Sequence, residues 1–373
     1  MTTEFAEVGL TRSSEKGRGA WLFSRRLDLT VFLVSAVLSL VALAVGRAAG
    51  VLDAETPGWA WVPAVVLCDV AHVWATLVRT YLNQHERQTR PLLLTAVPIL
   101  AFALGLGLYR LGDAVFWRAL AYIAIFHFVR QQYGWVALYR SRAGEHGRVG
   151  RAIDTAAIYA STLYPLLYWH THLPRAFAWF VAGDIVALPS YAMPFAQAAY
   201  VLALGAYVAR ACADALRGRP QNVGKHVVVG TTAVMWNVGI VVCNSDYAFT
   251  VTNVFIHGIP YFALVYIHAV QQAKSQTARP ATLLRNPWTY VAFLWTLAFA
   301  EEFFWDRGVW QERAWLFGEP WDAQALRGIL VPLLAVPALT HYVLDGFLWR
   351  KGAFRLERCD ALPQGERDCV NVG

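Results

Sequence analysis

Charged residues are scarce in this sequence, because Asp, Glu, Lys and Arg together make up only 15% of its 373 residues. A soluble domain usually carries about 25% charged residues, so the composition argues against an ordinary soluble fold. Hydrophobic residues reach 57%, and the 16 Trp fit a protein with two membrane interfaces. The net charge of +7 would suggest a nucleic-acid partner in a soluble protein. Here most basic residues lie in short loops between apolar runs, so no nucleic acid is expected.

Cysteine is also rare, with five residues in the whole chain. Cys68, Cys212 and Cys243 lie in apolar runs, where cysteine behaves as a small hydrophobic residue. Cys359 and Cys369 flank a polar stretch near the C-terminus. Their spacing matches no zinc-binding pattern, and the role of this tail stays open.

The sequence shows no cleavable signal peptide, no separate soluble domain and no convincing internal repeat. The first apolar run begins near Leu27, after a basic stretch, and is long enough to span a membrane. It is therefore expected to act as a signal anchor and as the first helix. An internal repeat is the mark of many secondary transporters, so its absence weighs against that class.

Apolar runs of ~17–25 residues recur along the chain and predict an all-α, polytopic integral membrane bundle of about ten transmembrane helices. A shorter stretch at 175–188, between Pro174 and Pro189, is expected to be interfacial or re-entrant. We place the spans at 28–47, 58–79, 91–109, 114–138, 151–169, 193–216, 225–245, 247–271, 287–305 and 327–349.

The basic residues test this count independently. If the N-terminus is cytoplasmic, every second connection should be rich in Arg and Lys. The opposite loops are short or acidic, notably 301–326, where Glu301 and Glu302 are expected to be solvated. The basic connections carry Arg79, Arg87 and Arg90; Arg140, Arg142, Arg148 and Arg151; Arg217, Arg219 and Lys225; Lys274, Arg279 and Arg285; and Arg350, Lys351 and Arg355.

Both termini are therefore expected on the cytoplasmic side of a cell membrane, the bacterial cytoplasmic membrane. Residues 28–349 would form one transmembrane domain. Residues 1–27 would be a cytoplasmic N-terminal segment, and residues 350–373 a cytoplasmic tail.

Strongly polar residues within the spans cost several kcal/mol unless they are paired, so each is a candidate functional residue. The pairs Asp69/His72 and His341/Asp345 have helical spacings that set both members on one face. The polar residues gather in four spans: Asp69, His72 and Arg79; His127, Arg130, Gln131 and Tyr133; His257 and His268; His341 and Asp345.

Helix geometry gives these groups a depth. At ~1.5 Å per residue from the cytoplasmic ends, His72, His127 and His341 lie ~10–16 Å deep, whereas His257 lies at ~21 Å and fits this layer least well. Imidazoles and carboxylates that meet at one depth predict a metal site, and His72, His127 and His341 should then lie within ~10 Å of one another. The candidate ligands are His72, His127, His341, His268, Asp69, Asp345 and His257.

This ligand chemistry suits non-haem iron, mono- or dinuclear, with zinc as the alternative ion. Arg130, Gln131, Tyr133 and Arg79 are assigned to catalysis or to the substrate pocket. The HxxxH and HxxHH boxes of di-iron desaturases are missing, as are the DxxxD and DGxxAR motifs of two lipid-enzyme families. In architecture alone, a multispan bundle with one histidine per helix resembles the bacterial Brp/Blh carotene dioxygenases, which bind iron through histidines.

These features favour a membrane-embedded, metal-dependent oxidoreductase or oxygenase that acts on a lipid or isoprenoid substrate in the cytoplasmic half of the bilayer. Such an enzyme implies membrane lipid and a lipophilic small molecule as partners, and a cytoplasmic electron donor. Oligomeric state is not set by the sequence. Two alternatives stay open: a proton-coupled transporter or channel that uses the same Asp–His pairs, and a zinc-dependent membrane lipid hydrolase.

Overall fold

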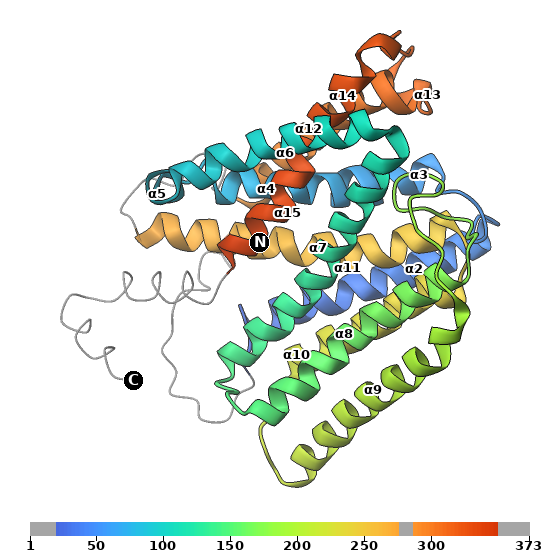
Figure 1. Cartoon of the computed structure of the whole chain (residues 1–373). Coiled ribbons are helices and arrows are strands. Elements are labelled where there is room, and N and C mark those ends of the chain that lie inside the picture. Colours follow the sequence, from blue (N-terminus) through green and yellow to red (C-terminus); the bar gives the residue numbers. More distant parts are fainter. Residues whose placement is uncertain (1–19, 276–285, 350–373) are drawn as a thin grey trace.

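A computed structural model describes residues 20–275 and 286–349, and every regular element in these ranges is a helix (Figure 1). The tail that holds Cys359 and Cys369 lies outside the described residues. Helical segments occupy all ten expected ranges: Arg25–Ala48 (α1, η1 and α2), Gly58–Arg79 (α3, η2 and α4), α6 Pro91–Leu111, α7 Asp113–Arg142, α8 Arg148–Thr171, α9 Met193–Leu216, Val223–Val242 (α10 and η4), α11 Asp246–Ser275, α12 Pro287–Trp305, and α14 Arg327–Leu334 followed by α15 Val336–Leu348.

Seven helical segments of the described residues are long and apolar enough to cross a membrane, which is compatible with a multi-pass membrane protein. Helices α7, α8 and α12 do not meet that test. Arg118, His127 and Arg130 lower the hydropathy of α7, and Glu301 and Glu302 lower that of α12. Of these three helices, only α7 carries candidate functional residues of the sequence analysis.

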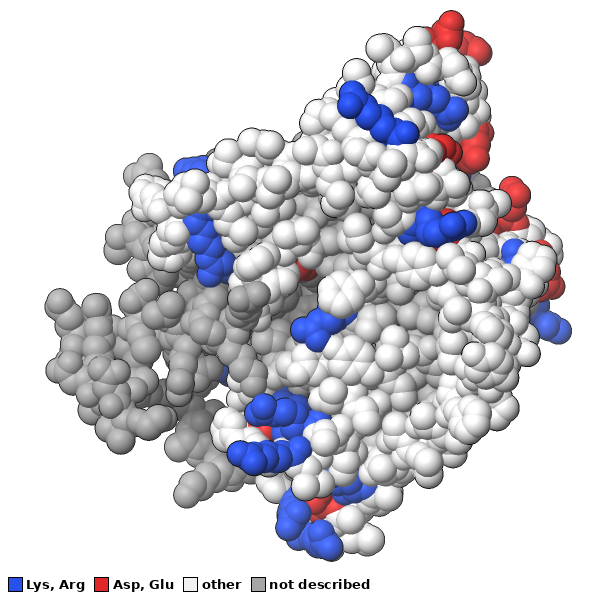
Figure 2. Space-filling model, viewed as in Figure 1, with Lys and Arg blue, Asp and Glu red and all other residues white. Residues whose placement is uncertain are grey.

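The core of the bundle lies around α11. In its most apolar stretch, 83% of the residues of α11 are buried, compared with 6% for α9, which lies at the edge beside α8 (Figure 1). Large apolar side chains such as Leu92 and Phe195 are 83% and 78% exposed on α6 and α9. Charged side chains gather mainly toward the ends of the molecule, and the face between them is mostly uncharged (Figure 2). Such a surface suits a hydrocarbon environment.

A glycine of α11 allows this helix to approach closely the π-helical stretch that precedes α4. A π-helical stretch, η2 (Val62–Val70), runs directly into α4 (Ala71–Arg79). At Gly258 of α11 a Cβ atom would lie 2.9 Å from the Cys68 carbonyl oxygen and 2.7 Å from the Cys68 Sγ. Because glycine has no Cβ, the two backbones can approach closely here. His257 precedes this glycine and His72 follows η2, so the contact brings both side chains to one place.

The connection between α8 and α9 has no long helix. Residues 172–189, which include the stretch expected to be interfacial or re-entrant, cover one end of the bundle as an irregular segment (Figure 1). Phe177 and Ile185 are buried in the core around Trp169. Side-chain packing therefore holds this segment in place, because it has no regular secondary structure.

A charged cluster joins α7, α8, α9 and α10, and we define it as Arg140, Glu145, Asp154, Arg210 and Lys225. Lys225 Nζ donates to Glu145 Oε2 (2.5 Å) and to Asp154 Oδ2 (3.0 Å). Arg140 pairs with the same two carboxylates, and Arg210 Nη1 donates to Asp154 Oδ1 (3.1 Å). Arg140 and Lys225 had been counted as charges of cytoplasmic loops, but both lie within helices and are buried.

Candidate metal centre

Four histidines from four helices converge in the interior of the bundle. His72 lies on α4, His127 on α7, His257 on α11 and His341 on α15, and none is more than 5% exposed. We call this group the histidine cluster. The four helices belong to the four spans in which the sequence shows the polar residues, and α4 and α7 each contact both α11 and α15.

The imidazole rings of the cluster lie in direct contact. Nε2 of His257 lies 3.0 Å from Nε2 of His72, and Nε2 of His341 lies 3.1 Å from Nε2 of His127. The ring centroids of His72 lie 6.3 Å from those of His127 and 4.8 Å from those of His341. The expected proximity of His72, His127 and His341 is therefore present.

His257 lies closer to His72 and His127 than its predicted depth indicates. The expectation that it fits the layer least well is wrong, because its ring lies 4.5 Å from His72 and 5.2 Å from His127 between centroids. It also stacks on Phe128, at 3.5 Å and 8°. The expected depth of His257 is measured from a span end at residue 271, but α11 continues to Ser275, whereas α4 ends at its expected residue, Arg79. Because the helices continue by different lengths past the expected span ends, those ends do not give a common reference for depth.

A chain of hydrogen bonds supports His341 from behind. The Nδ1 of His341 lies 2.7 Å from Thr76 Oγ1, and Thr76 Oγ1 lies 3.3 Å from the Tyr261 hydroxyl. Tyr261 donates to Asp345 Oδ1 at 2.5 Å. Asp345 itself is 3.8 Å from His341 Nδ1, which is beyond hydrogen-bond reach. The i, i+4 pair expected between His341 and Asp345 is therefore linked mainly through Thr76 and Tyr261.

The other carboxylate, Asp69, stands beside His72. Its Oδ1 lies 3.5 Å from His72 Nδ1, and neither atom has a hydrogen-bond partner among the described residues. The Nδ1 of His257 is likewise buried without a partner in this part of the chain. Buried polar atoms are usually paired, so these are groups for which a ligand would account.

The arrangement offers two sets of ligand atoms that would fit one ion each. His72, His127 and His257 bring their ligand atoms within 4.8 Å of one another, as do His127, His341 and Asp345. Two nitrogens at about 2.1 Å from one ion and at right angles would be ~3.0 Å apart, so the Nε2 contacts suit ligation as well as hydrogen bonding. Thr76 and Tyr261 would orient two members of the second set, because they hydrogen-bond to His341 Nδ1 and to Asp345 Oδ1.

His268 is not part of the histidine cluster, although it was a candidate ligand. It follows His257 by eleven residues on α11, which is ~16 Å along a helix. Its ring packs against Trp349, with 5.7 Å between centroids. Sharing a helix face with His257 is therefore not enough to place both side chains on one ion.

The residues assigned to catalysis or the substrate pocket lie in three different surroundings. Arg79 is buried, donates to Glu86 Oε1 at 2.6 Å and lies over the Trp349 ring. Gln131, one turn after His127, has both side-chain polar atoms buried without a partner among the described residues. Arg130 is exposed, and it contacts Tyr159 of α8 and the ring of Tyr133.

The expectation that Glu301 and Glu302 are solvated is wrong. Glu302 is 7% exposed. Glu301 accepts hydrogen bonds from two indole nitrogens, Trp74 Nε1 at 2.7 Å and Trp305 Nε1 at 3.3 Å. Two indole groups thus bind the Glu301 carboxylate, although α12 ends only a few residues later. Position near a helix end is therefore a poor guide to solvation where tryptophans surround the site.

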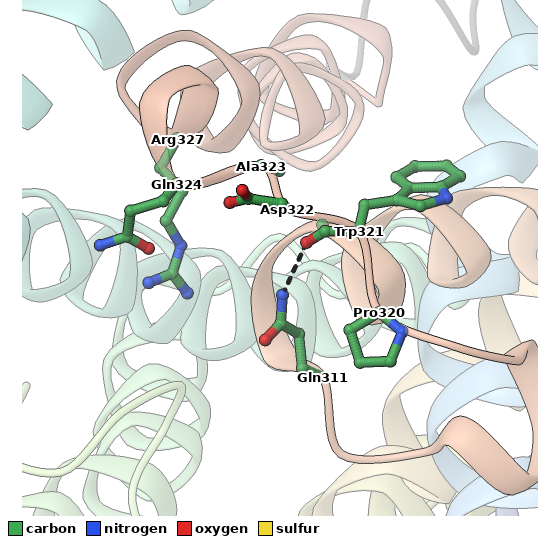
Figure 3. Close-up of a pocket in the computed structure, with 8 residues that line it drawn as sticks. Gln311, Pro320, Trp321, Asp322, Ala323, Gln324 and Arg327 are labelled. Atoms are coloured by element: carbon green, nitrogen blue, oxygen red, sulfur yellow. Dashed lines mark hydrogen bonds between the residues drawn. The ribbon is translucent and has the colours of Figure 1, made fainter.

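A polar pocket of about 300 Å³ lies away from the histidine cluster, between η6 (Asp306–Trp310), the loop that follows and α14 (Figure 3). Gln311 donates from Nε2 to the Trp321 carbonyl oxygen (3.1 Å) across this pocket. Asp322 and Gln324 on its rim are exposed. None of the candidate ligands lines it, so it adds nothing to the metal centre.

Thr76 is a residue of the site that sequence reasoning missed. It lies four residues after His72, on the same face of α4, and that spacing was the available signal. No family model matches the chain, and comparisons with curated proteins and with solved structures found no similar protein.

Proposed function

We propose that this protein is a membrane-embedded, metal-dependent enzyme whose metal ion is held by the histidine cluster in the cytoplasmic half of the bilayer. The observation that carries the proposal is the convergence of four buried imidazoles from four helices, with Nε2 atoms 3.0 and 3.1 Å apart. Polar side chains at this depth are expensive unless they serve a function. Hydrogen bonding between helices alone would not require four buried histidines at one place.

The ligand set favours iron and an oxidative reaction. His127, His341 and Asp345 provide two imidazoles and one carboxylate, which is the set that non-haem iron oxygenases use. His72 and His257, whose ligand atoms also lie near that of His127, would complete the coordination of the same ion. Bound iron would supply redox chemistry with dioxygen as oxidant, and a cytoplasmic donor would supply electrons that the substrate does not. His72, His127 and His257 provide three imidazoles, a set also found at catalytic zinc, so a zinc-dependent lipid hydrolase is the alternative enzyme.

A lipid or isoprenoid is the substrate class that the surroundings favour. A shallow apolar surface lies along α12 against η2, lined mainly by aromatic and apolar side chains such as Phe299 and Phe303. Trp295 donates from Nε1 to the Leu67 carbonyl oxygen at one side of it (2.9 Å). Because Leu67 lies two residues before Asp69, the apolar surface and the metal centre share one helix. Gln131 would hold a polar group of such a substrate.

The topology proposed with this function has ten spans and both termini on the cytoplasmic side of a bacterial cytoplasmic membrane. Helical segments in all ten expected ranges support the count. The acidic side chains visible in Figure 2 gather largely at the end that carries α13 (Ala314–Phe317), opposite to the basic connections. That distribution agrees with the positive-inside rule.

A second candidate function is proton-coupled transport. The contacts Asp69–His72–His257 and Thr76–His341–His127 form two chains of titratable or hydroxyl groups through the bundle. Chains of this kind carry protons in membrane pumps. This function would need no metal, and metal content therefore separates it from the enzyme.

Metal analysis of the detergent-purified protein is the test. We expect stoichiometric iron in the wild type, and its loss in His72→Ala and in His341→Ala. His268→Ala is the matched control, because it removes a buried histidine of α11 outside the cluster and should keep the metal. Zinc in place of iron would favour the hydrolase. Absence of metal from every preparation would refute the enzyme and favour the transporter.

A further inference from the structure

The lipid-facing side of α7 carries an arginine at an unexpected depth. Arg130 is exposed, one turn away from Phe126, which is 66% exposed on the same side. Twelve residues separate Arg130 from the end of α7 at Arg142, which is ~18 Å along the helix. The whole of α7 is ~45 Å long by the same rise, about the thickness of a bilayer with its head groups.

The partner of Arg130 gives a second measure of this depth. Its Nη1 donates to the hydroxyl of Tyr159, which lies eleven residues into α8 (Arg148–Thr171). That is ~16 Å along α8, close to the middle of the helix. Two helices thus agree that the guanidinium lies within the thickness of the bundle and not at its end.

The guanidinium of Arg130 contacts two tyrosine rings and has few hydrogen-bond partners. Its Cζ lies 4.8 Å from the centroid of Tyr133, three residues closer to the cytoplasmic end, and the Tyr133 and Tyr159 rings stack at 5.3 Å. Within residues 20–275 and 286–349, the bond to Tyr159 is the one hydrogen bond that Arg130 makes. Arginine has five N–H donors, so most of them have no partner among the described residues.

We propose that Arg130, Tyr133 and Tyr159 form a binding site for the acidic head group of a lipid of the cytoplasmic leaflet, which would be drawn below the membrane surface by local thinning of the bilayer. A phosphate would accept the remaining N–H groups of Arg130 in the bidentate geometry that guanidinium favours. Tyr159 accepts from Arg130 and so keeps its own O–H to donate to the same phosphate. The acyl chains would lie along the apolar side of α7 beside Phe126. An unpaired cation at this depth is costly, and an anionic head group removes that cost.

This inference rests on the proposed membrane placement of α7 and α8 but not on the metal. Thermal unfolding of the full chain in detergent, with added phosphatidylglycerol or phosphatidylcholine, tests it. We expect phosphatidylglycerol to bind about tenfold more tightly than phosphatidylcholine, and Arg130→Gln to remove that preference. Tyr159→Phe should reduce it. Arg118→Gln is the matched control, an exposed arginine near the other end of α7 that contacts Gly183, and should keep it.

Three results would overturn the proposal. They are the absence of a preference for phosphatidylglycerol in the wild type, a preference that persists in Arg130→Gln, and equal stabilisation by inorganic phosphate without lipid. The metal content of Arg130→Gln separates the two proposals, because it should equal that of the wild type. A variant that loses lipid preference and keeps its metal supports the lipid site alone.

Discussion

Two groups of polar side chains lie buried in this bundle, and they differ in how completely their atoms are paired. In the charged cluster, Asp154 alone accepts from Arg140, Arg210 and Lys225. In the histidine cluster, the Nδ1 atoms of His72 and His257 have no partner among the described residues. Asp154 at the centre of the charged cluster and His72 in the histidine cluster are each 1% exposed, so burial alone does not distinguish these two groups.

The difference separates a structural role from a functional one. A buried ion pair that is fully satisfied holds helices in register, and its loss leaves an uncompensated charge. A buried group of neutral ligands with unpaired atoms gains its partner only when an ion or substrate binds. We therefore expect changes in the charged cluster to affect stability, and changes in the histidine cluster to affect metal binding.

The largest expected effect is the loss of metal from His257→Ala. This histidine contacts His72 and His127, so its removal takes one ligand from the centre of the site. The folded variant should retain almost no bound metal, measured by elemental analysis. Asp154→Asn should keep wild-type stoichiometry in its folded fraction. Equal metal content in His257→Ala and wild type would contradict the division between the two clusters.

Asp154→Asn should in turn have the largest effect on stability. The neutral side chain would leave three cations short of a buried partner, at a cost of about 3 kcal/mol. The measurement is the midpoint of thermal unfolding in detergent. Glu312→Gln is a useful control, because Glu312 pairs with Arg313 on the surface (2.9 Å) and should matter little. Similar midpoints for the two variants would show that the charged cluster is not the structural element proposed.

A smaller effect on metal binding is expected from residues that hydrogen-bond to the ligands without binding the metal. Tyr261→Phe removes the hydroxyl that joins Thr76 to Asp345, and metal affinity should fall by about tenfold. Tyr290→Phe is the matched control, because Tyr290 is also buried but its hydroxyl has no partner among the described residues. Metal titration of the chelator-treated protein measures both. Equal affinities would mean that the hydrogen-bonded chain does not orient His341.

The smallest effect is a dependence of stability on pH at the charged cluster. Burial alone would raise the pKa of Glu145, but hydrogen bonds from Lys225 and Asn222 outweigh it and hold the pKa below its ordinary value of 4.5. A carboxyl whose pKa is lowered by folding stabilises the protein above its unfolded pKa, and this contribution is lost as the pH falls through the folded pKa.

Unfolding midpoints measured at a series of pH values check this sign. The wild type should lose stability as the pH falls below 4.5, and Glu145→Gln should lose less over the same interval, since it has no proton to take up there. Metal binding by the histidine cluster is not expected to explain that difference. A steeper loss in Glu145→Gln would show that the carboxylate is not stabilised by its cationic neighbours.

The hydropathy pattern predicts where the helical segments lie, because long apolar runs favour helices. Each expected span coincides with a helical segment, since an apolar run of that length has few other stable conformations in a membrane. The histidines of four spans could be grouped for the same reason: polar residues in spans must face the interior. His257 and His268 show the limit, because depth along a helix depends on where that helix ends.

The contacts between helices are what the sequence leaves open. Thr76 supports His341 from another helix, and Glu301 is held by Trp74 across the bundle. Pairings of this kind depend on rotation and close approach, as at Gly258, and one sequence alone does not specify them. Lys225 shows the same limit, because its position near a helix start indicates a loop charge although packing buries it.

X-ray absorption at the edge of the bound metal tests the central claim most directly, because it reports which atoms surround the ion. The account predicts nitrogen ligands from several imidazoles at about 2.0–2.1 Å, and a spectrum that changes in His72→Ala, His127→Ala and His341→Ala but not in His268→Ala. A metal surrounded by sulfur or by oxygen alone, or a spectrum that none of the cluster variants alters, would contradict it.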